Sequence, residues 1–593
     1  MSEKKVSFWR IFWPTLTATI VVSFIGWIFV LVLVGGMFSE EEVVKDKTVL
    51  HLTLSGNIGE TSDASINSMS FSVDKTTGLS DLLYGFERAA KDDEVKGIFI
   101  DLKGVECGYA TAHEIRDAIH TFRKSGKFVV AYLSGEVITQ KQYYISSAAN
   151  KVYGFPTSAM EFMGLGTEMT YFKGMFDKVG VEMQVIRGSN NDFKSAVEPF
   201  FRENMSDSSR LQVERFLGSI WSDIRAEIAK DRKITSQSLN EIAEYAKIQR
   251  VEDALKYKMI DGVKYRDEVI DLVQKKAGGK SDMTNLMAFE KYAKTKFKND
   301  QLINGGEASS ANIAVIVAEG GITVDGDEMT SVNICRYFRE ARESKNIKTV
   351  VFRVNSPGGS ALASEEIWRE VMLTAKKMKV IVSMGDVAAS GGYYIATPAS
   401  YIFAEPTTIT GSIGVFGVIP YTGKLFEENF GMTFDRAQTN SHAVLSTNRK
   451  LTEEELKLIQ TEVDQIYTQF KKRVSDGRGM TQKKVEVLAR GRVWTGTDAL
   501  GNGLVDAIGG LSDAIAYAQK KAGIKEAKIK YWPEIKEDPL ADILEQLSEK
   551  ESASIKVKST ELPKELVDTY LRLKQLDQLS GIQMRLPYFM ELH

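Results

Sequence analysis

Residues Gly385–Gly414 read GDVAASGGYYIATPASYIFAEPTTITGSIG, and residues Gly135–Gly164 read GEVITQKQYYISSAANKVYGFPTSAMEFMG. The two stretches lie 250 positions apart and align without a gap, with nine of thirty residues identical. Average residue usage would give roughly two identities. The identical residues of the later stretch are Gly385, Val387, Tyr393, Tyr394, Ile395, Ala399, Pro406, Thr407 and Gly414. A period of this length indicates two related domains rather than a solenoid of short repeats.

Short apolar stretches alternate with amphipathic helical stretches in both halves of the chain. In the first half, we expect strands at 49–54, 97–102 and 128–133, with a helix at 112–123. In the second half, we expect strands at 313–318, 349–354 and 380–384, with helices at 332–343 and 363–377. Strands that alternate with helices imply parallel βαβ units, so the sequence predicts an α/β fold.

The overall composition is that of a folded, globular protein. The chain has 593 residues, which is too many for one ordinary core, and 43% of them are hydrophobic. The net charge is −3 and no long basic block occurs, so we expect no nucleic-acid partner. The few histidines lack metal-binding spacing, so we expect no metal site. Cys107 and Cys335 favour two buried thiols over a single disulfide.

An apolar segment near the amino terminus, residues 13–38, is long enough to span a bilayer as a helix. Basic residues precede it and an acidic run follows it, so residues 1–12 are expected on the cytoplasmic side. The alternative is a cleaved signal peptide, but the segment is long for one and Gly35–Ser39 is a poor cleavage site. The sequence therefore predicts a single membrane anchor.

Changes in composition divide the rest of the chain. Residues 276–311 contain two runs rich in glycine, serine and other polar residues, which are typical of a linker. The last part of the chain is charged and partly helical, which indicates a peripheral or assembly segment. The predicted units are 47–275 for the first repeat, 276–311 for the linker, 312–524 for the second repeat and 525–593 for the C-terminal segment.

The later of the two aligned stretches places Ser390 where a buried strand gives way to a helix. The backbone N–H groups after such a serine lack helical partners and can stabilise an oxyanion. The plainer interpretation is a helix N-cap serine followed by a glycine turn. A second glycine motif, Asn355–Gly359, follows the neighbouring strand, and sites in open α/β sheets form at the carboxyl ends of strands. Gly391 and either Gly358 or Gly359 are therefore candidate oxyanion donors.

A serine hydroxyl needs a base to become a nucleophile. No histidine lies near Ser390 in the sequence, so a Ser-His-Asp triad has little support. A lysine is the other option, but burial must lower its pKa from about 10.4 towards neutrality. Lys194 lies among apolar and small residues in Asp192–Phe200, which makes it one candidate among many lysines.

Three motifs together resemble those of a known family, namely Asn355–Gly359 (NSPGG), Ser390–Tyr394 (SGGYY) and Phe193–Phe200 (FKSAVEPF). With its apolar amino terminus and its two repeats, nearly the whole chain resembles the long, duplicated signal peptide peptidases of serine peptidase family S49. The resemblance implies two tandem duplicated crotonase-like, or Clp-protease-like, α/β domains plus an N-terminal transmembrane helix.

The resemblance also implies an activity and the residues that carry it. The matches to the family's nucleophile, general base, lysine-orienting serine and oxyanion region are, in that order, Ser390, Lys194, Ser412 and the glycines Gly391, Gly358 and Gly359. The plainer interpretation of Ser412 is a turn serine. The implied substrates are short hydrophobic peptides, including cleaved signal peptides, with no cofactor and a homotetrameric assembly. The expected location is the bacterial inner membrane, with the catalytic domains on the periplasmic side.

The alignment of the two repeats separates these residues. In the first repeat Gln140 stands where the second has Ser390, and residues 103–107 lack the Pro-Gly-Gly turn. In the second repeat no lysine stands at the position that corresponds to Lys194. Each half lacks what the other keeps, so the predicted active site spans both repeats.

Two other functions remain open from the sequence. An acyl-thioester enzyme could share the fold, although the anchor and the serine–lysine pair argue against it. A non-catalytic, peptide-binding scaffold at the membrane is the second, although the retention of the whole residue set argues against it.

Overall fold

The computed structural model describes residues 12, 13, 16, 17, 19, 23, 44, 46–67, 72–278, 286–294, 310–326, 329–534 and 582–586. Apart from a few helical positions, the segments 1–12 and 13–38 predicted at the amino terminus lie outside these residues. Within the described part of the chain, no helix combines the length and the apolar character that crossing a membrane requires. The anchor therefore stays a prediction.

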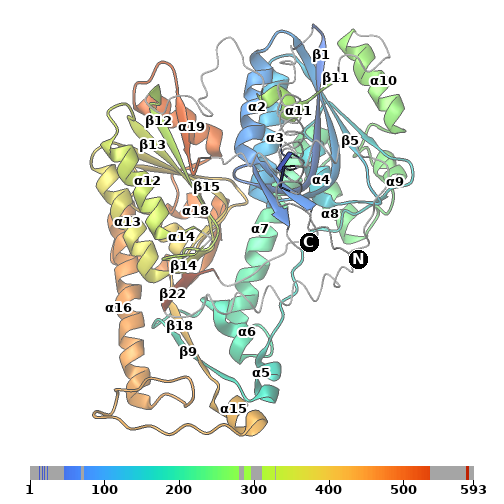
Figure 1. Cartoon of the computed structure of the whole chain (residues 1–593). Coiled ribbons are helices and arrows are strands. Elements are labelled where there is room, and N and C mark those ends of the chain that lie inside the picture. The colour runs from blue at the N-terminus through green and yellow to red at the C-terminus, as the bar shows by residue number, and fades with distance from the viewer. Residues whose placement is uncertain are drawn as a thin grey trace, which may run out of the picture.

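The first half of the chain folds around an eight-stranded sheet (Figure 1). Its parallel part runs in the order β10 (Gly262–Val263), β7 (Lys151–Gly154), β5 (Phe128–Leu133), β4 (Val95–Glu106), β1 (Thr48–Gly59) and β11 (Leu286–Ala288). β3 (Ser72–Gly78) pairs with the end of β1, and β2 (Asp63–Asn67) runs antiparallel to β3. Every residue of β5, FVVAYL, is buried, as expected for a parallel strand with both faces covered.

The second half is built around a second sheet of eight strands. Its parallel part runs in the order β20 (Ala507–Ile508), β16 (Tyr401–Ala404), β15 (Lys379–Ala389), β13 (Thr349–Ser356), β12 (Ile313–Glu319) and β21 (Ile529–Trp532). β17 (Ile409–Gly411) pairs in parallel with the far end of β15, and β19 (Val493–Thr495) runs antiparallel to β17.

Both sheets share one strand order, since β10-β7-β5-β4-β1-β11 corresponds to β20-β16-β15-β13-β12-β21. Each half also contains one long helix of 26 residues, namely α7 (Asp207–Arg232) and α16 (Glu453–Arg478). The structure thus confirms the α/β fold, and each strand expected from the sequence lies within an observed strand. The helix expected at 363–377 ends at Ala375.

Helices pack against both sheets because each buries one apolar face. In α7 the buried apolar residues recur every three or four positions, at Val213, Phe216, Ile220, Ile224 and Ile228. Further helices of the first half are α2 (Leu79–Lys91), α3 (Tyr109–Lys124), α4 (Gln140–Ser146), α8 (Ser236–Glu244), α9 (Val251–Lys256), α10 (Arg266–Ala277) and α11 (Phe289–Lys294). Those of the second are α12 (Ser331–Glu343), α13 (Ala361–Ala375), α14 (Gly391–Ala396), α17 (Gln482–Leu488), α18 (Gly496–Asn502) and α19 (Leu511–Lys521).

Two segments outside the predicted repeats add strands to the sheets. β11 lies within the segment 276–311 that the sequence assigned to a linker, and it pairs with β1. β21 lies within the segment 525–593 that the sequence assigned to the periphery, and it pairs with β12. These are short edge strands whose pairing depends on a sheet that is already formed, so they leave little local pattern in the sequence.

A smaller, antiparallel sheet joins the two halves (Figure 1). Its order is β14 (Gly358–Ser360), β22 (Ile582–Arg585), β18 (Phe416–Tyr421) and β9 (Glu182–Arg187). β9 belongs to the first half of the chain and pairs along its whole length with β18 of the second. The pairing brings the chain that follows β9 against the second half. Short helices surround this sheet, namely α5 (Lys173–Val179), α6 (Glu198–Phe201), α15 (Gly423–Phe430) and the 3-10 helix η1 (Ser195–Val197).

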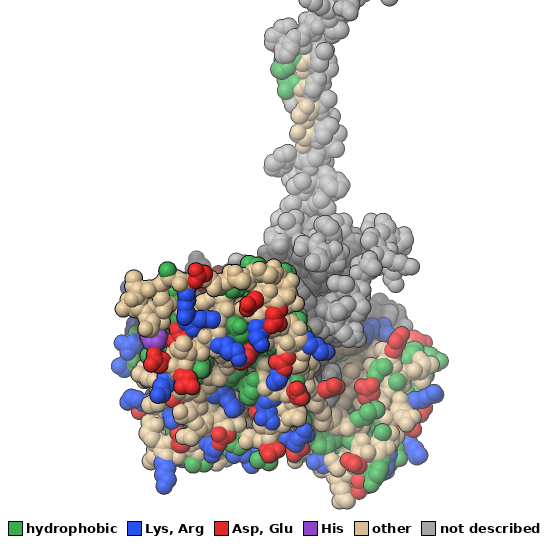
Figure 2. Space-filling model, turned by 90° about the horizontal axis from the view of Figure 1, so that it is seen from below, with side chains coloured by type: hydrophobic (Ala, Val, Ile, Leu, Met, Phe, Trp, Pro, Cys, Tyr) green, Lys and Arg blue, Asp and Glu red, His purple; other side chains and the backbone are tan. Residues whose placement is uncertain are grey.

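The face of the molecule seen from below carries charges of both signs. Figure 2 shows that lysine and arginine side chains are interspersed with aspartate and glutamate over the face seen from below. This agrees with the near balance of 76 basic and 79 acidic residues in the chain.

Both cysteines are free thiols. Cys335 is buried in the core of the second half, and Cys107 is half-buried. Burial raises the pKa of Cys107 to about 12, which favours the protonated thiol near neutral pH.

Candidate active site

Ser390 follows β15 and stands directly before α14, at the turn that the sequence predicted. Its backbone has φ 54° and ψ −114°, a combination that costs an L residue of order 1–3 kcal/mol. Its N–H donates to the carbonyl oxygen of Gly411 at 2.8 Å, and its own carbonyl oxygen accepts from Tyr394 at 2.8 Å. Ser390 does stand at the N-cap position of α14, but its side chain makes no capping hydrogen bond, so helix capping does not account for the serine side chain.

Lys194 points at this serine. Its Nζ lies 2.8 Å from Oγ of Ser390, 3.0 Å from Oγ of Ser412 and 3.0 Å from the carbonyl oxygen of Ser412. All three side chains are fully buried, with 0% of each residue exposed. The structure therefore brings together, within one chain, three residues that the sequence placed in two separate repeats.

The surroundings of Lys194 favour its neutral form. Burial lowers the pKa of this amine well below its usual value. A neutral amine has two N–H donors and one lone pair, and the two oxygens of Ser412 match the two donors. The lone pair is then left for the hydroxyl proton of Ser390, which is the geometry a general base requires.

Backbone contacts between the two halves position Lys194. The N–H of Phe193 donates to the carbonyl oxygen of Arg490 at 3.0 Å. The next residue, Gly491, donates to Ile413 at 2.9 Å and lies directly against the lysine. A Cβ on Gly491 would lie 2.5 Å from Cβ of Lys194, so glycine is required there. The sequence did not single out Gly491, because a lone glycine in a loop carries no functional pattern.

Gln212 on α7 is a second residue that the sequence did not reveal. Its amide nitrogen donates to the carbonyl oxygen of Phe193 at 3.2 Å, and its oxygen accepts from the N–H of Val493 at 3.0 Å. The buried glutamine thus connects the lysine segment of the first half to β19 of the second. A glutamine within an amphipathic helix is usually a surface residue, so its pattern gave no signal.

The glycines of the two predicted turns meet beside Ser390. A Cβ on Gly358 would lie 2.6 Å from the backbone nitrogen of Gly391, and the φ of Gly358 is +94°, so glycine is required on both grounds. The N–H of Gly391 opens α14 and has no acceptor within that helix. A Cβ on Gly359 would lie 2.2 Å from the carbonyl oxygen of Ile322, so Gly359 supports the turn from its other side.

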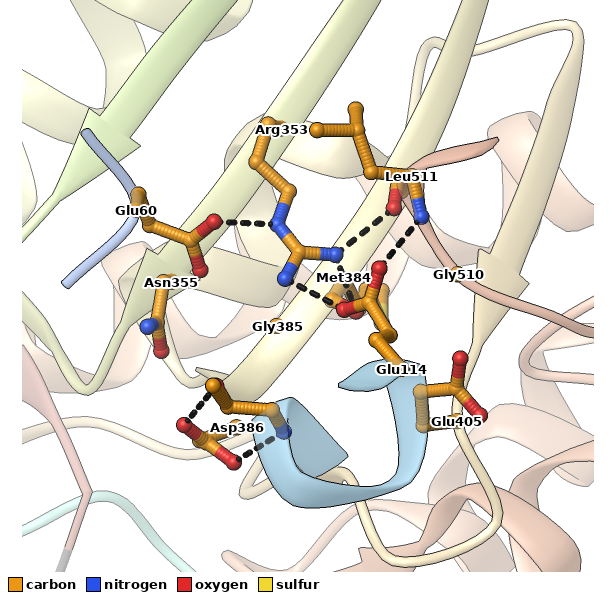
Figure 3. Close-up of polar contacts among 12 residues, drawn as sticks. Glu60, Glu114, Arg353, Asn355, Met384, Gly385, Asp386, Glu405, Gly510 and Leu511 are labelled. Atoms are coloured by element: carbon orange, nitrogen blue, oxygen red, sulfur yellow. Dashed lines mark hydrogen bonds and ion pairs between the residues drawn. The ribbon is translucent and has the colours of Figure 1, made fainter. Parts of the chain in front are cut away.

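Side chains from both halves hold the end of β15 that leads to Ser390. The Asp386 carboxylate accepts from the N–H of Thr111 at 2.9 Å and from its hydroxyl at 2.6 Å, at the N-terminus of α3. Asn355 accepts from the N–H of Val387 at 3.1 Å through its side-chain oxygen. Figure 3 shows Asp386 and Asn355 at the end of this strand. The Asn355 motif therefore shapes the strand that carries the serine.

Arg353 on β13 joins the halves through buried charges (Figure 3). It donates to Glu60 at 2.8 Å and to Glu114 at 2.6 Å, both from the first half, and to the hydroxyl of Ser383 at 2.9 Å. Burial raises the pKa of Glu114 to about 8, although the charge of Arg353 opposes this rise. The arginine is fully buried, so its ion pairs with Glu60 and Glu114 lie inside the interface between the halves, and we call these three residues the latch.

Ion pairs account for the two groups of metal-ligating side chains in the described part of the chain, which are His113, Asp117 and Glu405, and His120, Glu227 and Asp231. Nδ1 of His113 lies 2.7 Å from the carboxylate of Glu405. Burial would lower the pKa of His113, but the hydrogen bond and charge of Glu405 raise it to about 9. In the second group Arg116 pairs with Asp231 at 2.6 Å. Neither arrangement calls for a metal.

Comparison with known proteins gives one family. The model of peptidase family S49 matches residues 121–280 and 372–525, together more than half of the chain. The chain is 34% identical to serine protease SPPA, chloroplastic, of Arabidopsis thaliana, across 81% of this chain and 70% of that protein. It is 35% identical to protease 4 of Salmonella typhi, across 77% and 74%. It is 36% identical to protease 4 of Haemophilus influenzae, across 74% and 72%.

Among solved structures, a ClpP1 mutant from Listeria monocytogenes overlaps 34% of this chain and 93% of its own length, with 14% identity and a TM-score of 0.24. A TM-score this low does not establish a shared fold, so the Clp-protease-like assignment of the two domains stays a prediction. The family match and the extent of the relatives do not depend on it. The chain belongs to peptidase family S49 and is a serine peptidase.

Proposed function

We propose that this peptidase is a membrane-anchored endopeptidase that hydrolyses short hydrophobic peptides through a Ser390–Lys194 dyad. One observation carries the proposal, namely the buried Nζ of Lys194 at 2.8 Å from Oγ of Ser390. Burying a lysine amine costs free energy, and ordinary structural roles do not require it. A buried lysine beside a strained serine is the arrangement that nucleophilic catalysis without histidine needs.

The reaction proceeds in two acyl-transfer steps. Neutral Lys194 takes the hydroxyl proton of Ser390, and Oγ forms a bond to the carbonyl carbon of the peptide. The N–H groups of Gly391 and of the Gly358–Gly359 turn hold the oxyanion. The lysine ammonium then protonates the leaving amine as the C–N bond breaks. Water, deprotonated by the same lysine, then attacks the ester carbon. The bond between that carbon and Oγ breaks, and the lysine ammonium returns the proton to Ser390.

Ser412 is a positioning residue in this mechanism. Its hydroxyl and carbonyl oxygens accept both N–H groups of the neutral amine. The lone pair of Lys194 is thereby directed at Ser390 rather than at other acceptors. We expect its loss to slow the reaction less than the loss of either member of the dyad.

Apolar residues beside the dyad support the proposed substrate class, which includes cleaved signal peptides. The ring of Phe416 lies 6.0 Å from Nζ of Lys194, in a buried cluster with Val197, Phe200 and Val418. The apolar segment 13–38 supports attachment to the bacterial inner membrane, with the catalytic domains on the periplasmic side. The homotetramer and the absence of a cofactor are proposed from the family resemblance.

Active-site labelling tests the proposal directly. A fluorophosphonate should phosphonylate the purified chain at a single residue with loss of fluoride, and peptide mapping should place the label on Ser390. Ser390→Ala and Lys194→Ala should each lower kcat on a hydrophobic fluorogenic peptide by at least about a thousandfold, because nucleophile and base act as one unit.

Lys457→Ala is the matched control, since this lysine is exposed on α16. It should retain full activity, and circular dichroism should show all variants folded. A label on another residue, or full activity in Ser390→Ala, would overturn the mechanism.

A further inference from the structure

β22 comes from the end of the chain, yet it lies at the active site. In the order β14-β22-β18-β9, Ile582–Arg585 stands between β14, which carries Gly358, and β18, which follows Ser412 (Figure 1). Both pairings are antiparallel. Four residues from near the end of the chain thus form a hydrogen-bonded strand beside the turn that carries Ser390.

The register of β22 brings one of its carbonyl groups to the glycines beside Ser390. Gly359 pairs with Met584 across the β14–β22 ladder. A Cβ on Gly358 would lie 2.0 Å from the carbonyl oxygen of Met584, and a Cβ on Gly391 would lie 3.0 Å from the same oxygen. The carbonyl oxygen of Met584 therefore lies against the two turns proposed to hold an oxyanion.

The strand is anchored on both sides of that carbonyl. Beyond it, the N–H of Leu586 donates to the carbonyl oxygen of Pro357 at 2.6 Å. Before it, Gln583 pairs with Ser360 and with Phe416. Backbone hydrogen bonds on both flanks are how extended peptides add to a sheet edge, so the binding mode is that of a peptide ligand.

Burial shows how closely this segment is held. Met584 is 1% exposed and packs in the hydrophobic core of the second half. Leu586 is 6% exposed and packs in the core of the first half, in a cluster that also includes Ala389. Ser390 and Lys194 have no exposed surface. A peptide therefore reaches this nucleophile only after a part of the surrounding structure moves, and β22 lies against the glycines beside it.

We propose that Ile582–Leu586 occupies the position of a peptide substrate, with the Met584 carbonyl at the oxyanion amides, and that the tail competes with substrates for Ser390. The inference rests on the peptidase function proposed above and narrows its substrate class. A substrate binds as an extended strand between β14 and β18, with an unbranched apolar side chain in the place of Met584.

Removal of β22 tests the competition. In a chain that ends at Gln578, fluorophosphonate should label Ser390 faster and kcat/KM on a hydrophobic peptide should rise. We expect about tenfold or more, because a tethered competitor acts at an effective concentration of order mM. A synthetic peptide of residues 579–589 should then inhibit the shortened chain competitively, raising KM and leaving kcat unchanged.

A point substitution in the full chain provides a second test. Met584→Asp places a carboxylate at a buried apolar position, which should release the strand and produce the same rise in labelling rate. Met432→Asp, at a methionine that is 49% exposed outside β22, is the matched control and should label at the original rate. The 579–589 peptide with the Met584→Asp change should not inhibit.

Equal labelling rates and equal KM in the full, shortened and Met584→Asp chains would overturn the tail proposal and leave the dyad standing. Absence of labelling at Ser390 and of cleavage in every chain would instead reject the peptidase mechanism. If the shortened chain does not fold, the labelling rate of the Met584→Asp chain decides whether the tail competes with substrates for Ser390.

Discussion

Ser390 and Lys194 each adopt a state that an isolated residue avoids. The serine has a positive φ, and the lysine has a buried amine whose pKa is lowered by loss of solvent. Both states cost folding free energy, and such costs concentrate at functional sites, where the surrounding structure enforces them. The hydroxyl and carbonyl of Ser412 are the neighbours that make the neutral amine acceptable.

The pH profile of the enzyme should report the pKa of Lys194. We expect kcat/KM to rise as the amine loses its proton and to reach a plateau well below pH 10.5, the ordinary lysine value. The measurement is kcat/KM and fluorophosphonate labelling across about pH 5 to 10. A midpoint near the ordinary lysine value would contradict the assignment.

Stability measurements provide a second reading of the same pKa. Because the folded-state pKa of Lys194 is depressed, the unfolded chain binds the extra proton between that pKa and 10.5. The free energy of unfolding of the wild type should therefore rise with pH relative to Lys194→Met through this window. Parallel stability curves for the two proteins would argue against a depressed pKa.

At the scale of elements, the catalytic strand is held by contacts across the interface between the halves. β15 receives support from α3 through Asp386, and β13 receives it through the pairs of Arg353 with Glu60 and Glu114. β9 adds to β18 and carries the lysine segment with it. The latch and the small sheet therefore keep the two halves of the dyad in one geometry.

Arg353→Met should destabilise the protein by about 3–5 kcal/mol, because it leaves two buried carboxylates unpaired. The pKa of Glu114, already raised by burial to about 8, should rise further without the arginine. The protonated carboxyl of Glu114 contributes stability at low pH, and this contribution is lost as pH rises through the folded-state pKa of Glu114. The loss in Arg353→Met should therefore be larger above pH 8 than near about pH 5.

Guanidinium unfolding at both pH values checks this expectation. Arg339→Met is the matched control, since that arginine is half-exposed and its partner Glu370 keeps a second ion pair with Arg342. It should cost less than about 1 kcal/mol. Combining Arg353→Met with Glu60→Gln and Glu114→Gln should recover much of the loss. An equal loss at both pH values would show that packing, rather than charge, dominates.

At the scale of the whole molecule, the residues of the proposed active site are divided between two related halves of a single chain. Lys194 and Ser390 are 196 residues apart in sequence and meet within the same chain. Each half has its own sheet with the same strand order, and the catalytic pair forms where the halves pack together. Neither half contains a complete site.

Mixing experiments should show that the dyad forms within one chain. Ser390→Ala and Lys194→Ala proteins, dissociated and reassembled together, should have no more peptidase activity than the sum of the separate proteins. Wild type reassembled with Ser390→Ala serves as the control and should keep its activity per wild-type chain. Recovery of activity in the mixture of the two inactive variants would mean that the pair forms between chains.

Much of the site could be predicted from local sequence, but in unequal degree. The Ser390 turn has a common structural explanation as a helix N-cap, and it stood out because a second glycine motif, Asn355–Gly359, follows the neighbouring strand. Lys194 did not stand out among the many lysines, since its burial depends on packing, and the family resemblance supplied it. Gly491 and Gln212 carried no pattern, because their roles exist only when both halves are in contact.

The sequence by itself determined the α/β class, the duplication and the positions of the main strands, because hydrophobic periodicity is a local property of the chain. Only the tertiary structure decided that Lys194 reaches Ser390, that β11 and β21 extend the sheets, and that β22 lies between β14 and β18. These features join residues that are far apart in sequence. Their free energy comes from packing and desolvation in the assembled fold, which no local pattern encodes.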